Sequence, residues 1–225
     1  MAPGTRLLND DGSASMATLI MLSHHAFRRD LARFARALSQ VLAGEDSRLD
    51  ALSGEWQTFH AALHGHHQIE DTQMFPSMRS QAPALAAAID QLAAQHHQID
   101  PLLERGDRAF STLSTAAGDA QRLVAELTAL LDEHLTLEEA SVIPLLRGAK
   151  EFPAPPDDAA AEMYAGGFAW SMHGIAESVL GPVKTMLPEI LVKRLPAACE
   201  AFAARCERVW GSRAAGSSET SHPNG

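Results

Sequence analysis

The chain has 225 residues, which is enough for one or two domains with a buried core. It is 46% hydrophobic and 20% charged, a balance typical of globular proteins. The low aromatic content of 5%, together with abundant Ala and Leu, favours helices over strands. The net charge of -10 argues against nucleic acid or an anionic membrane as the main partner.

No segment of the sequence predicts secretion or a membrane span. No run reaches the ~18 apolar residues that a membrane span requires, and residues 1–11 lack the apolar stretch of a secretory signal. Cys199 and Cys206 are too few for a disulfide framework. On one helix they would lie about 10 Å apart, too far to pair within it. We therefore expect a cytoplasmic protein.

The spacing of apolar residues predicts an all-α protein. Residues three and four apart form one apolar stripe on each of four long segments, which are joined by short connections. Such segments are expected to pack as an antiparallel up-down four-helix bundle. Pro76 should end the second helix, and Pro101 should kink the third. The predicted helices span residues 17–42, 49–75, 83–113 and 117–146.

A Pro-rich break at residues 150–158 separates the predicted bundle from a shorter helical extension. Two further helices are predicted there, at residues 168–186 and 188–210. This pair of helices is too small to fold alone, so we expect it to pack on the bundle. The sequence also leaves open whether two chains form a homodimer through the extension. The predicted domains are a flexible N-terminal arm at 1–15, the four-helix bundle at 16–149, a C-terminal helical extension packed on the bundle at 150–211 and a disordered tail at 212–225.

One motif occurs twice in the predicted bundle. In each copy a histidine is followed by a glutamate, a second acid, an apolar residue and a proline, at offsets of four, five, nine and ten residues. Residues four apart lie on one face of a helix, so the histidine and glutamate of each copy can hold one ion between them. The duplication suggests two imidazoles and two carboxylates at a shared centre. The copies are His66-Glu70-Asp71-Phe75-Pro76 and His134-Glu138-Glu139-Ile143-Pro144.

Ionisable residues also occupy positions that the apolar stripes assign to the core. A single core histidine is more often a hydrogen-bonded polar residue than a metal ligand. A whole set of buried unpaired groups would cost several kcal/mol each, which exceeds the ~5–15 kcal/mol of net stability of a domain. We therefore predict a metal centre. Its predicted ligands are His24, His66, Glu70, His96, His134 and Glu138.

The donor set narrows the choice of metal. Imidazoles with carboxylates suit iron, manganese or zinc, but this set is larger than one tetrahedral zinc needs. We predict two iron ions joined by an oxo or hydroxo bridge and by the carboxylates of Glu70 and Glu138, with manganese or zinc as less favoured alternatives. A ferritin-like site would need Glu-x-x-His motifs, which the predicted bundle lacks. We expect the bundle to bind metal without the extension.

These motifs resemble those of hemerythrin-like (HHE cation-binding) domains over residues 17–146. The resemblance implies a four-helix bundle around a non-haem di-iron centre. It also implies a function within a family that includes oxygen carriers, sensors of oxygen, redox state and iron, and proteins that handle peroxide or nitric oxide. The matching segments are His24-x-x-Phe27-Arg28, His66-x-x-x-Glu70-Asp71, His96-x-x-Ile99 and His134-x-x-x-Glu138-Glu139.

The chain departs from hemerythrin itself at Asp100. Hemerythrin has a second histidine at this place, four residues after the first on the third helix, so the present set is one imidazole short. Asp100 could bind metal and make the site richer in carboxylates, or one iron could keep an extra open position. Asp100 could instead be solvated beside Pro101. The first two outcomes would weaken a pure oxygen-carrier function.

Other histidines lie beside the predicted ligands. His67 and His97 each follow an inward histidine and are candidates for additional ligands, for partners of ligands, or for the surface. His60, His64 and His67 share a neighbouring helix face, which is typical of solvated histidines but also allows a proton relay or an accessory metal site. We expect metal to be retained without His67.

Three functions fit the predicted centre. The favoured one is binding or sensing of O2, NO or peroxide and other reactive oxygen species. The second is an enzyme, either a di-iron oxidase or oxygenase or a catalyst that decomposes peroxide. The third is iron buffering, which six buried ligands argue against because they favour a tight site. No output domain typical of a sensor is visible in the sequence, so the sequence leaves enzymatic turnover undecided.

Overall fold

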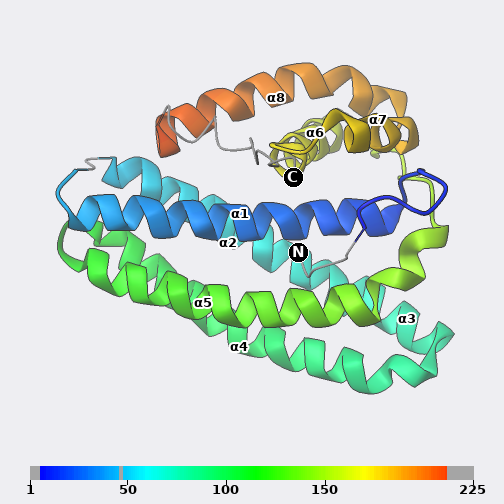
Figure 1. The fold of residues 1–225 in the computed structure, drawn as a ribbon, viewed down its shortest axis with the longest axis horizontal. Coiled ribbons are helices and arrows are strands. Elements are labelled where there is room, and N and C mark those ends of the chain that lie inside the picture. Colours follow the sequence, from blue (N-terminus) through cyan, green and yellow to red (C-terminus); the bar gives the residue numbers. More distant parts are fainter. Residues whose placement is uncertain (1–5, 46–47, 212–225) are drawn as a thin grey trace, which may run out of the picture.

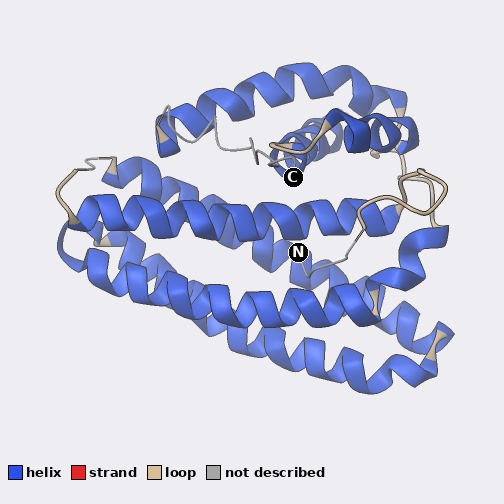
Figure 2. Cartoon of the chain, viewed as in Figure 1, coloured by secondary structure: helices blue, strands red, loops and turns tan. Residues whose placement is uncertain are grey.

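The computed structural model describes residues 6–45 and 48–211 of the chain. Within these residues every regular element is helical, which confirms the predicted all-α class (Figure 2). A π-helical turn separates α2 from α3, and 3-10 turns precede α4 and follow α5. The α-helices are α1 (Met16–Leu42), α2 (Leu49–Ile69), α3 (Phe75–Gln81), α4 (Ala86–Ser111), α5 (Leu113–Ser141), α6 (Asp158–Met172), α7 (Glu177–Met186) and α8 (Glu189–Trp210).

Helices α1, α2, α4 and α5 run alongside one another (Figure 1) and share one hydrophobic core. α1 and α4 each contact both α2 and α5. The core forms because the apolar stripes of these helices face inward, and full burial of one large apolar side chain contributes ~1.5–3 kcal/mol. Its most buried members include Phe27, Phe34, Trp56, Leu103 and Leu127.

The second predicted helix is not a single helix that Pro76 ends. α2 ends at Ile69, a π-helical turn follows at Glu70–Met74, and α3 continues past Pro76 to Gln81. Pro76 lies in the first turn of α3, where a backbone N–H has no helical partner to lose. The prediction was wrong because the π-helical turn starts a new helix in which this proline is tolerated. Pro101 likewise lies inside a helix, α4.

The first helix of the extension begins earlier than predicted, and the described part of the extension contains one more helix than predicted. α6 starts at Asp158, where the Asp157 carboxylate accepts a hydrogen bond from the Ala160 backbone N–H at 2.8 Å and caps the helix. The chain then turns at Gly174, whose φ of +83° is in the left-handed region, before α7 begins. The helix predicted at residues 168–186 therefore joined the end of α6 to α7, because apolar periodicity does not reveal this turn.

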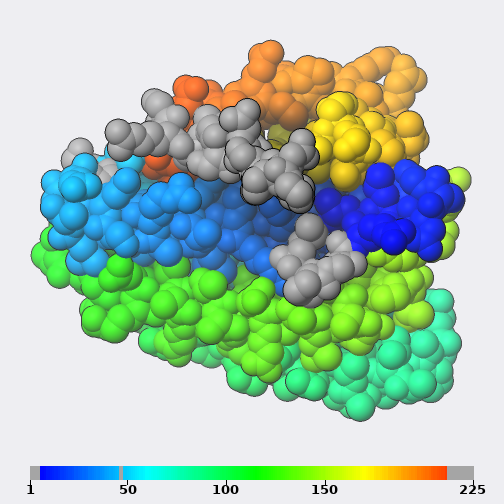
Figure 3. Space-filling view, viewed as in Figure 1, coloured from blue at the N-terminus to red at the C-terminus, as the bar shows by residue number. Residues whose placement is uncertain are grey.

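The extension packs against α1 and α2 rather than standing apart (Figure 3). Trp170 of α6 donates a hydrogen bond from Nε1 to Oδ2 of the buried Asp30 at 2.7 Å. Arg29 Nη1 donates to the carbonyl of Trp170 at 2.9 Å. Phe202 and Trp210 of α8 are part of the same core as α1 and α2. The extension thus completes the main core on one side.

Residues 6–15, which we predicted as part of a flexible arm, make defined contacts with the helices. Thr18 Oγ1 donates to the carbonyl of Leu7 at 2.8 Å. Arg147 Nη2 donates to the carbonyl of Arg6 at 2.8 Å. These bonds tie the segment to the start of α1 and to the turn after α5.

The rest of the predicted arm, residues 1–5, and the predicted tail at residues 212–225 lie outside the described part of the chain. Of the helices in the described part, none has both the length and the apolar character needed to cross a membrane.

Candidate metal centre

Histidine and glutamate side chains from α1, the α2 end, α4 and α5 bring their donor atoms together in the interior. They form two groups, and within each group one donor atom of every residue lies within 4.8 Å of the others. All the predicted ligands are present, and His67 joins them. The first group is His24, His66, Glu70 and Glu138, and the second is His67, Glu70, His96 and His134.

Glu70 belongs to both groups, and its two oxygens face different groups. Oε1 lies 2.9 Å from Nε2 of His66, in the first group. Oε2 lies 3.4 Å from Nε2 of His96, in the second group. Neither oxygen has the geometry of a hydrogen bond to its neighbour. Donor atoms bound at right angles, each ~2.1 Å from one ion, would also lie about 3 Å apart.

The helix that carries Glu70 supplies a histidine to each side of it. His66 and His67 precede Glu70 by four and three residues, so they lie on the previous turn and flank its side chain. This geometry assigns His66 to the first group and His67 to the second. One short segment therefore provides three donors to two neighbouring positions.

The second copy of the motif also spans both groups. Glu138 Oε2 lies 3.2 Å from Nε2 of His24, in the first group. His134 belongs to the second group, and its Nε2 lies 3.3 Å from Nε2 of His96. Each copy of the motif thus offers donors to both positions, but only Glu70 belongs to both groups.

The second acid of each motif copy holds a histidine from a neighbouring helix. Asp71 Oδ1 lies 2.9 Å from Nδ1 of His96, and Glu139 Oε1 lies 3.2 Å from Nδ1 of His24. Because a carboxylate accepts the Nδ1–H, Nε2 is left to bind an ion, as in many metal sites. The sequence showed these acids at the same offset but did not reveal their partners, which lie on other helices.

The π-helical turn places a phenylalanine next to the centre. The Phe75 backbone N–H donates to the carbonyl of Glu70, five residues earlier. The Phe75 ring consequently stacks on the ring of His96, with centroids 5.7 Å apart. On the opposite side, the Phe27 ring lies 5.3 Å from that of His66. Apolar rings therefore flank the donors and limit the access of water.

Buried donors without partners show that the residues present fit a bound cation. Both nitrogens of His67 and both carboxylate oxygens of Glu70 and of Glu138 are buried without a hydrogen bond. Each such atom costs ~1–3 kcal/mol if it stays unsatisfied. Between the Nε2 atoms of His96 and His134, a proton or a metal ion must be present to avoid repulsion of two lone pairs. Metal ions would satisfy all these atoms together.

The pKa values of the imidazoles also suit metal binding. Burial, reinforced by neighbouring imidazoles, holds the pKa of His67 far below its ordinary value and lowers that of His134 to about 3. Both are therefore neutral donors. Burial also opposes a charge on His24, but the carboxylates of Glu138 and Glu139 outweigh it and raise its pKa to about 9. An ion that binds His24 must displace this proton.

The pKa values of the two central carboxylates shift in opposite directions when no ion is bound. Burial raises the pKa of Glu138, and the nearby charge of Glu70 raises it further. Burial opposes the charge of Glu70 as well, but the imidazole of His66 holds its pKa well below the ordinary value. A divalent ion between the carboxylates would favour the ionised form of both.

The structure places His67 in the second ligand group, one of the roles left open for it, which argues against full retention of metal without it. The structure also locates two other residues. His67 is only 2% exposed and stacks on His96 with ring centroids 4.0 Å apart, because packing turns both His66 and His67 toward the centre. Asp100 belongs to neither group; its Oδ1 lies 3.5 Å from Nδ1 of the exposed His64. His97 is exposed and likewise outside both groups.

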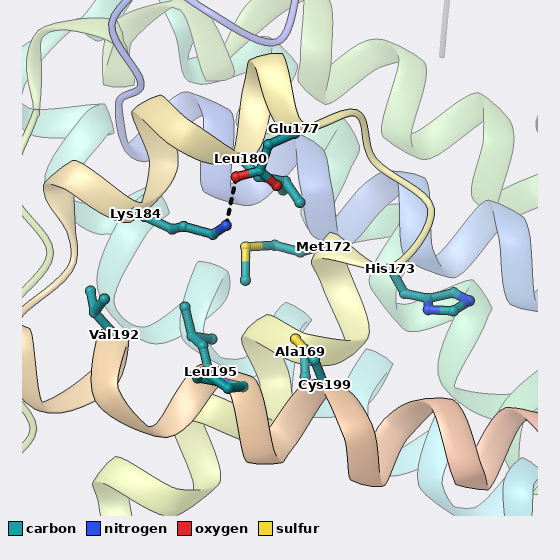
Figure 4. Close-up of a pocket in the computed structure, with 10 residues that line it drawn as sticks. Ala169, Met172, His173, Glu177, Leu180, Lys184, Val192, Leu195 and Cys199 are labelled. Carbon is teal, nitrogen blue, oxygen red and sulfur yellow. Dashed lines mark hydrogen bonds and ion pairs between the residues drawn. The ribbon is translucent and has the colours of Figure 1, made fainter.

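A separate cavity of about 390 Å³ lies within the extension, between α6, α7 and α8 (Figure 4). Met172, Leu180 and Leu195 form part of its apolar wall. Glu177 and Lys184 also line it and form an ion pair at 2.7 Å. None of its lining residues belongs to either ligand group, so the candidate metal centre forms no part of its wall.

Comparison with known proteins identifies the family. The model of the hemerythrin HHE cation binding domain matches residues 15–162, which is more than half of the chain. Neither the curated proteins nor the solved structures gave a match. The matched segment contains every residue of the two ligand groups. The resemblance seen in the motifs is thereby confirmed, and the chain belongs to the hemerythrin HHE cation-binding family.

Proposed function

We propose that this protein binds two iron ions, one at each ligand group, within an antiparallel four-helix bundle made by α1, α2, α4 and α5. The observation that carries the proposal is the position of Glu70, which belongs to both groups and turns one oxygen toward each. A carboxylate placed in this way can bridge two ions. Glu138 would be the second carboxylate ligand.

The number of imidazoles supports ligand binding over redox turnover. The sequence suggested one imidazole too few, because Asp100 replaces a histidine of hemerythrin. His67 supplies the missing imidazole from a different helix, since it belongs to the second group and lies at the end of α2. A site rich in neutral imidazoles stabilises oxidised iron less than a site rich in carboxylates would. Asp100 is therefore not needed as a ligand.

The proposed function is reversible binding or sensing of O2, NO or a reactive oxygen species. Paired iron would supply the open coordination positions for such a molecule. The protein's own residues would hold the imidazoles in position, through Asp71 and Glu139, and keep bulk water away, through Phe27 and Phe75. We expect this function to be exercised in the cytoplasm.

An enzyme that reduces or decomposes peroxide is the second candidate, and one contact favours it. The Asp71 side chain is 39% exposed and contacts Nδ1 of the buried His96, so it joins solvent to the centre and could deliver a proton. An oxygenase is less well supported, because no residue of either ligand group lines the cavity in the extension. Buffering of iron is disfavoured by the burial of the donors.

The test is metal content per chain, measured on protein purified without added metal, with absorption spectra before and after reduction and return to air. Two irons per chain, with the near-ultraviolet absorption of paired ferric ions, would support the proposal. A spectrum that cycles reversibly in air would favour binding or sensing, whereas consumption of added peroxide would favour the enzyme. One zinc per chain, or no metal, would contradict the di-iron proposal.

A further inference from the structure

A second set of histidine–carboxylate pairs joins α2 to α4 outside the candidate metal centre. His60 Nδ1 lies 2.9 Å from Asp107 Oδ1, and His64 Nδ1 lies 3.5 Å from Asp100 Oδ1. All of these side chains reach solvent, with His64 54% exposed. The proposed di-iron centre includes none of these four residues.

A carboxylate orients one of these imidazoles as it would in a metal site. Because Asp107 accepts at Nδ1 of His60, the free lone pair of that histidine lies on Nε2. Asp100 Oδ1 lies near Nδ1 of His64 but without the geometry of a hydrogen bond. Asp107 is itself held in place, since it also accepts from Trp56 Nε1 at 2.9 Å and from Gln57 Nε2 at 3.1 Å. The contact between Asp107 and His60 repeats the arrangement of Asp71 with His96 in the buried centre.

His60 and His64 can chelate one ion. They are four residues apart on α2 and therefore share a face, a spacing that binds zinc in other helices. Their ring centroids are 6.3 Å apart, and both side chains are exposed enough to adjust their rotamers. On α4 the exposed Glu104 lies one turn from both Asp100 and Asp107, so it can add a carboxylate.

The exposed pairs continue toward the buried centre along the same two helices. His64 precedes His67 by three residues on α2, and Asp100 follows His96 by four on α4. His67 and His96 are the next pair across the two helices, with stacked rings and only 2% exposure each. A row of potential ligands thus leads from solvent to the second ligand group.

We propose that His60, oriented by Asp107, and His64, which lies beside Asp100, form an exposed site for a divalent cation that is on its way to the buried centre. The role in loading rests on the proposed function, whereas the exposed site itself does not. The net charge of -10 would add a general attraction for cations.

The test uses the full chain, stripped of metal by a chelator, and Co²⁺ as the probe. His60→Ala/His64→Ala is compared with the wild type and with His97→Ala, which removes an exposed imidazole from α4 outside the row. Equilibrium dialysis gives the ions bound per chain. Stopped-flow absorption gives the rate at which the buried centre fills. We expect the double variant to bind one Co²⁺ fewer and to load at least ~10-fold more slowly, the lower end of the range for electrostatic capture.

Equal stoichiometry in the double variant and the wild type would overturn the exposed site. Equal loading rates, or the same slowing in His97→Ala, would overturn its role in loading. If the wild type bound only one Co²⁺ and the double variant bound none, the exposed site would be supported and the buried centre would be rejected. Circular dichroism of the stripped proteins checks that all three retain the same helical fold.

Discussion

Glu70 is the residue on which the two ligand groups depend. Its oxygens lie 2.9 Å from a nitrogen in one group and 3.4 Å from a nitrogen in the other. Glu138 is assigned to the first group alone. The two glutamates therefore occupy matching places in the repeated motif but differ in the number of ions that each can serve.

Replacing Glu70 should consequently cost more metal than replacing Glu138. We expect Glu70→Ala to reduce the metal content from about two ions per chain to below about one, and to lower the melting temperature, since metal binding stabilises the fold. Glu138→Ala should retain the ion of the second group. Elemental analysis and thermal unfolding with and without chelator measure both effects. Full occupancy in Glu70→Ala would refute its bridging role.

For His67, the two possible roles of metal ligand and packing residue predict opposite effects of a substitution on the stability of the metal-free protein. Both of its nitrogens are buried and lack hydrogen bonds. Without metal, these unsatisfied nitrogens lower the stability of the fold, whereas with metal one of them can bind the ion. His67→Leu should therefore stabilise the metal-free protein by ~1–3 kcal/mol, because it removes unsatisfied polar atoms.

The same His67→Leu change should abolish binding at the second group. Denaturant unfolding with chelator, and again with saturating metal, separates the two effects, and His97→Ala is the control with an exposed imidazole. If His67→Leu destabilises the metal-free protein and leaves the metal content unchanged, His67 is a packing residue and not a ligand.

At the scale of helices, the π-helical turn shapes the centre, and one close contact sets the approach of α2 and α4. The turn at Glu70–Met74 rotates the chain so that Phe75 packs on His96. On the other side of the core, α4 approaches α2 closely at Gly106. A Cβ atom built on Gly106 would overlap the Trp56 ring. Trp56 in turn stacks on Phe110 with centroids 4.5 Å apart.

Gly106→Ala should therefore destabilise the protein despite the higher helix propensity of alanine. We expect a loss of ~1–3 kcal/mol, because the stacked Trp56 ring must move. Gly54→Ala on α2 is the matched control: its Cβ would meet nothing within 4 Å, so the change should stabilise by up to ~1 kcal/mol. Denaturant unfolding measures both, and two changes of the same sign would contradict this packing.

For the molecule as a whole, the extension is part of the core. Phe202, Val209 and Trp210 of α8 pack in the same cluster as Phe34 of α1. The buried Asp30 of α1 accepts from Trp170 of α6, which also packs on Phe27 beside His66. Removing the extension would expose apolar side chains and leave a buried carboxylate without this partner.

The expectation that the bundle alone would bind metal therefore changes. We now expect deletion of residues 151–225 to abolish cooperative unfolding or solubility, because the main core loses one of its sides. Deletion of residues 212–225 alone, the segment that the sequence predicts as a disordered tail, should leave stability and metal content unchanged. Thermal unfolding followed by circular dichroism compares the two deletions. A folded, metal-binding 1–150 fragment would show that the extension is dispensable.

The all-α class and the family could be predicted from the sequence because both depend on local spacing. Apolar residues three and four apart identify helices, and histidines within those stripes must face the interior. The same argument found His24, His66, Glu70, His96, His134 and Glu138. It also predicted a metal, since the cost of burying these groups does not depend on how the helices are arranged.

Only the tertiary structure decided how these donors are grouped. A stripe on one helix does not specify its rotation against three others, so the sequence could not assign His67 to the second group. It could not pair Asp71 with His96 either. It also missed the π-helical turn and the turn at Gly174, because neither changes the apolar pattern. Ligand grouping depends on contacts between helices, and spacing along one helix cannot determine those contacts.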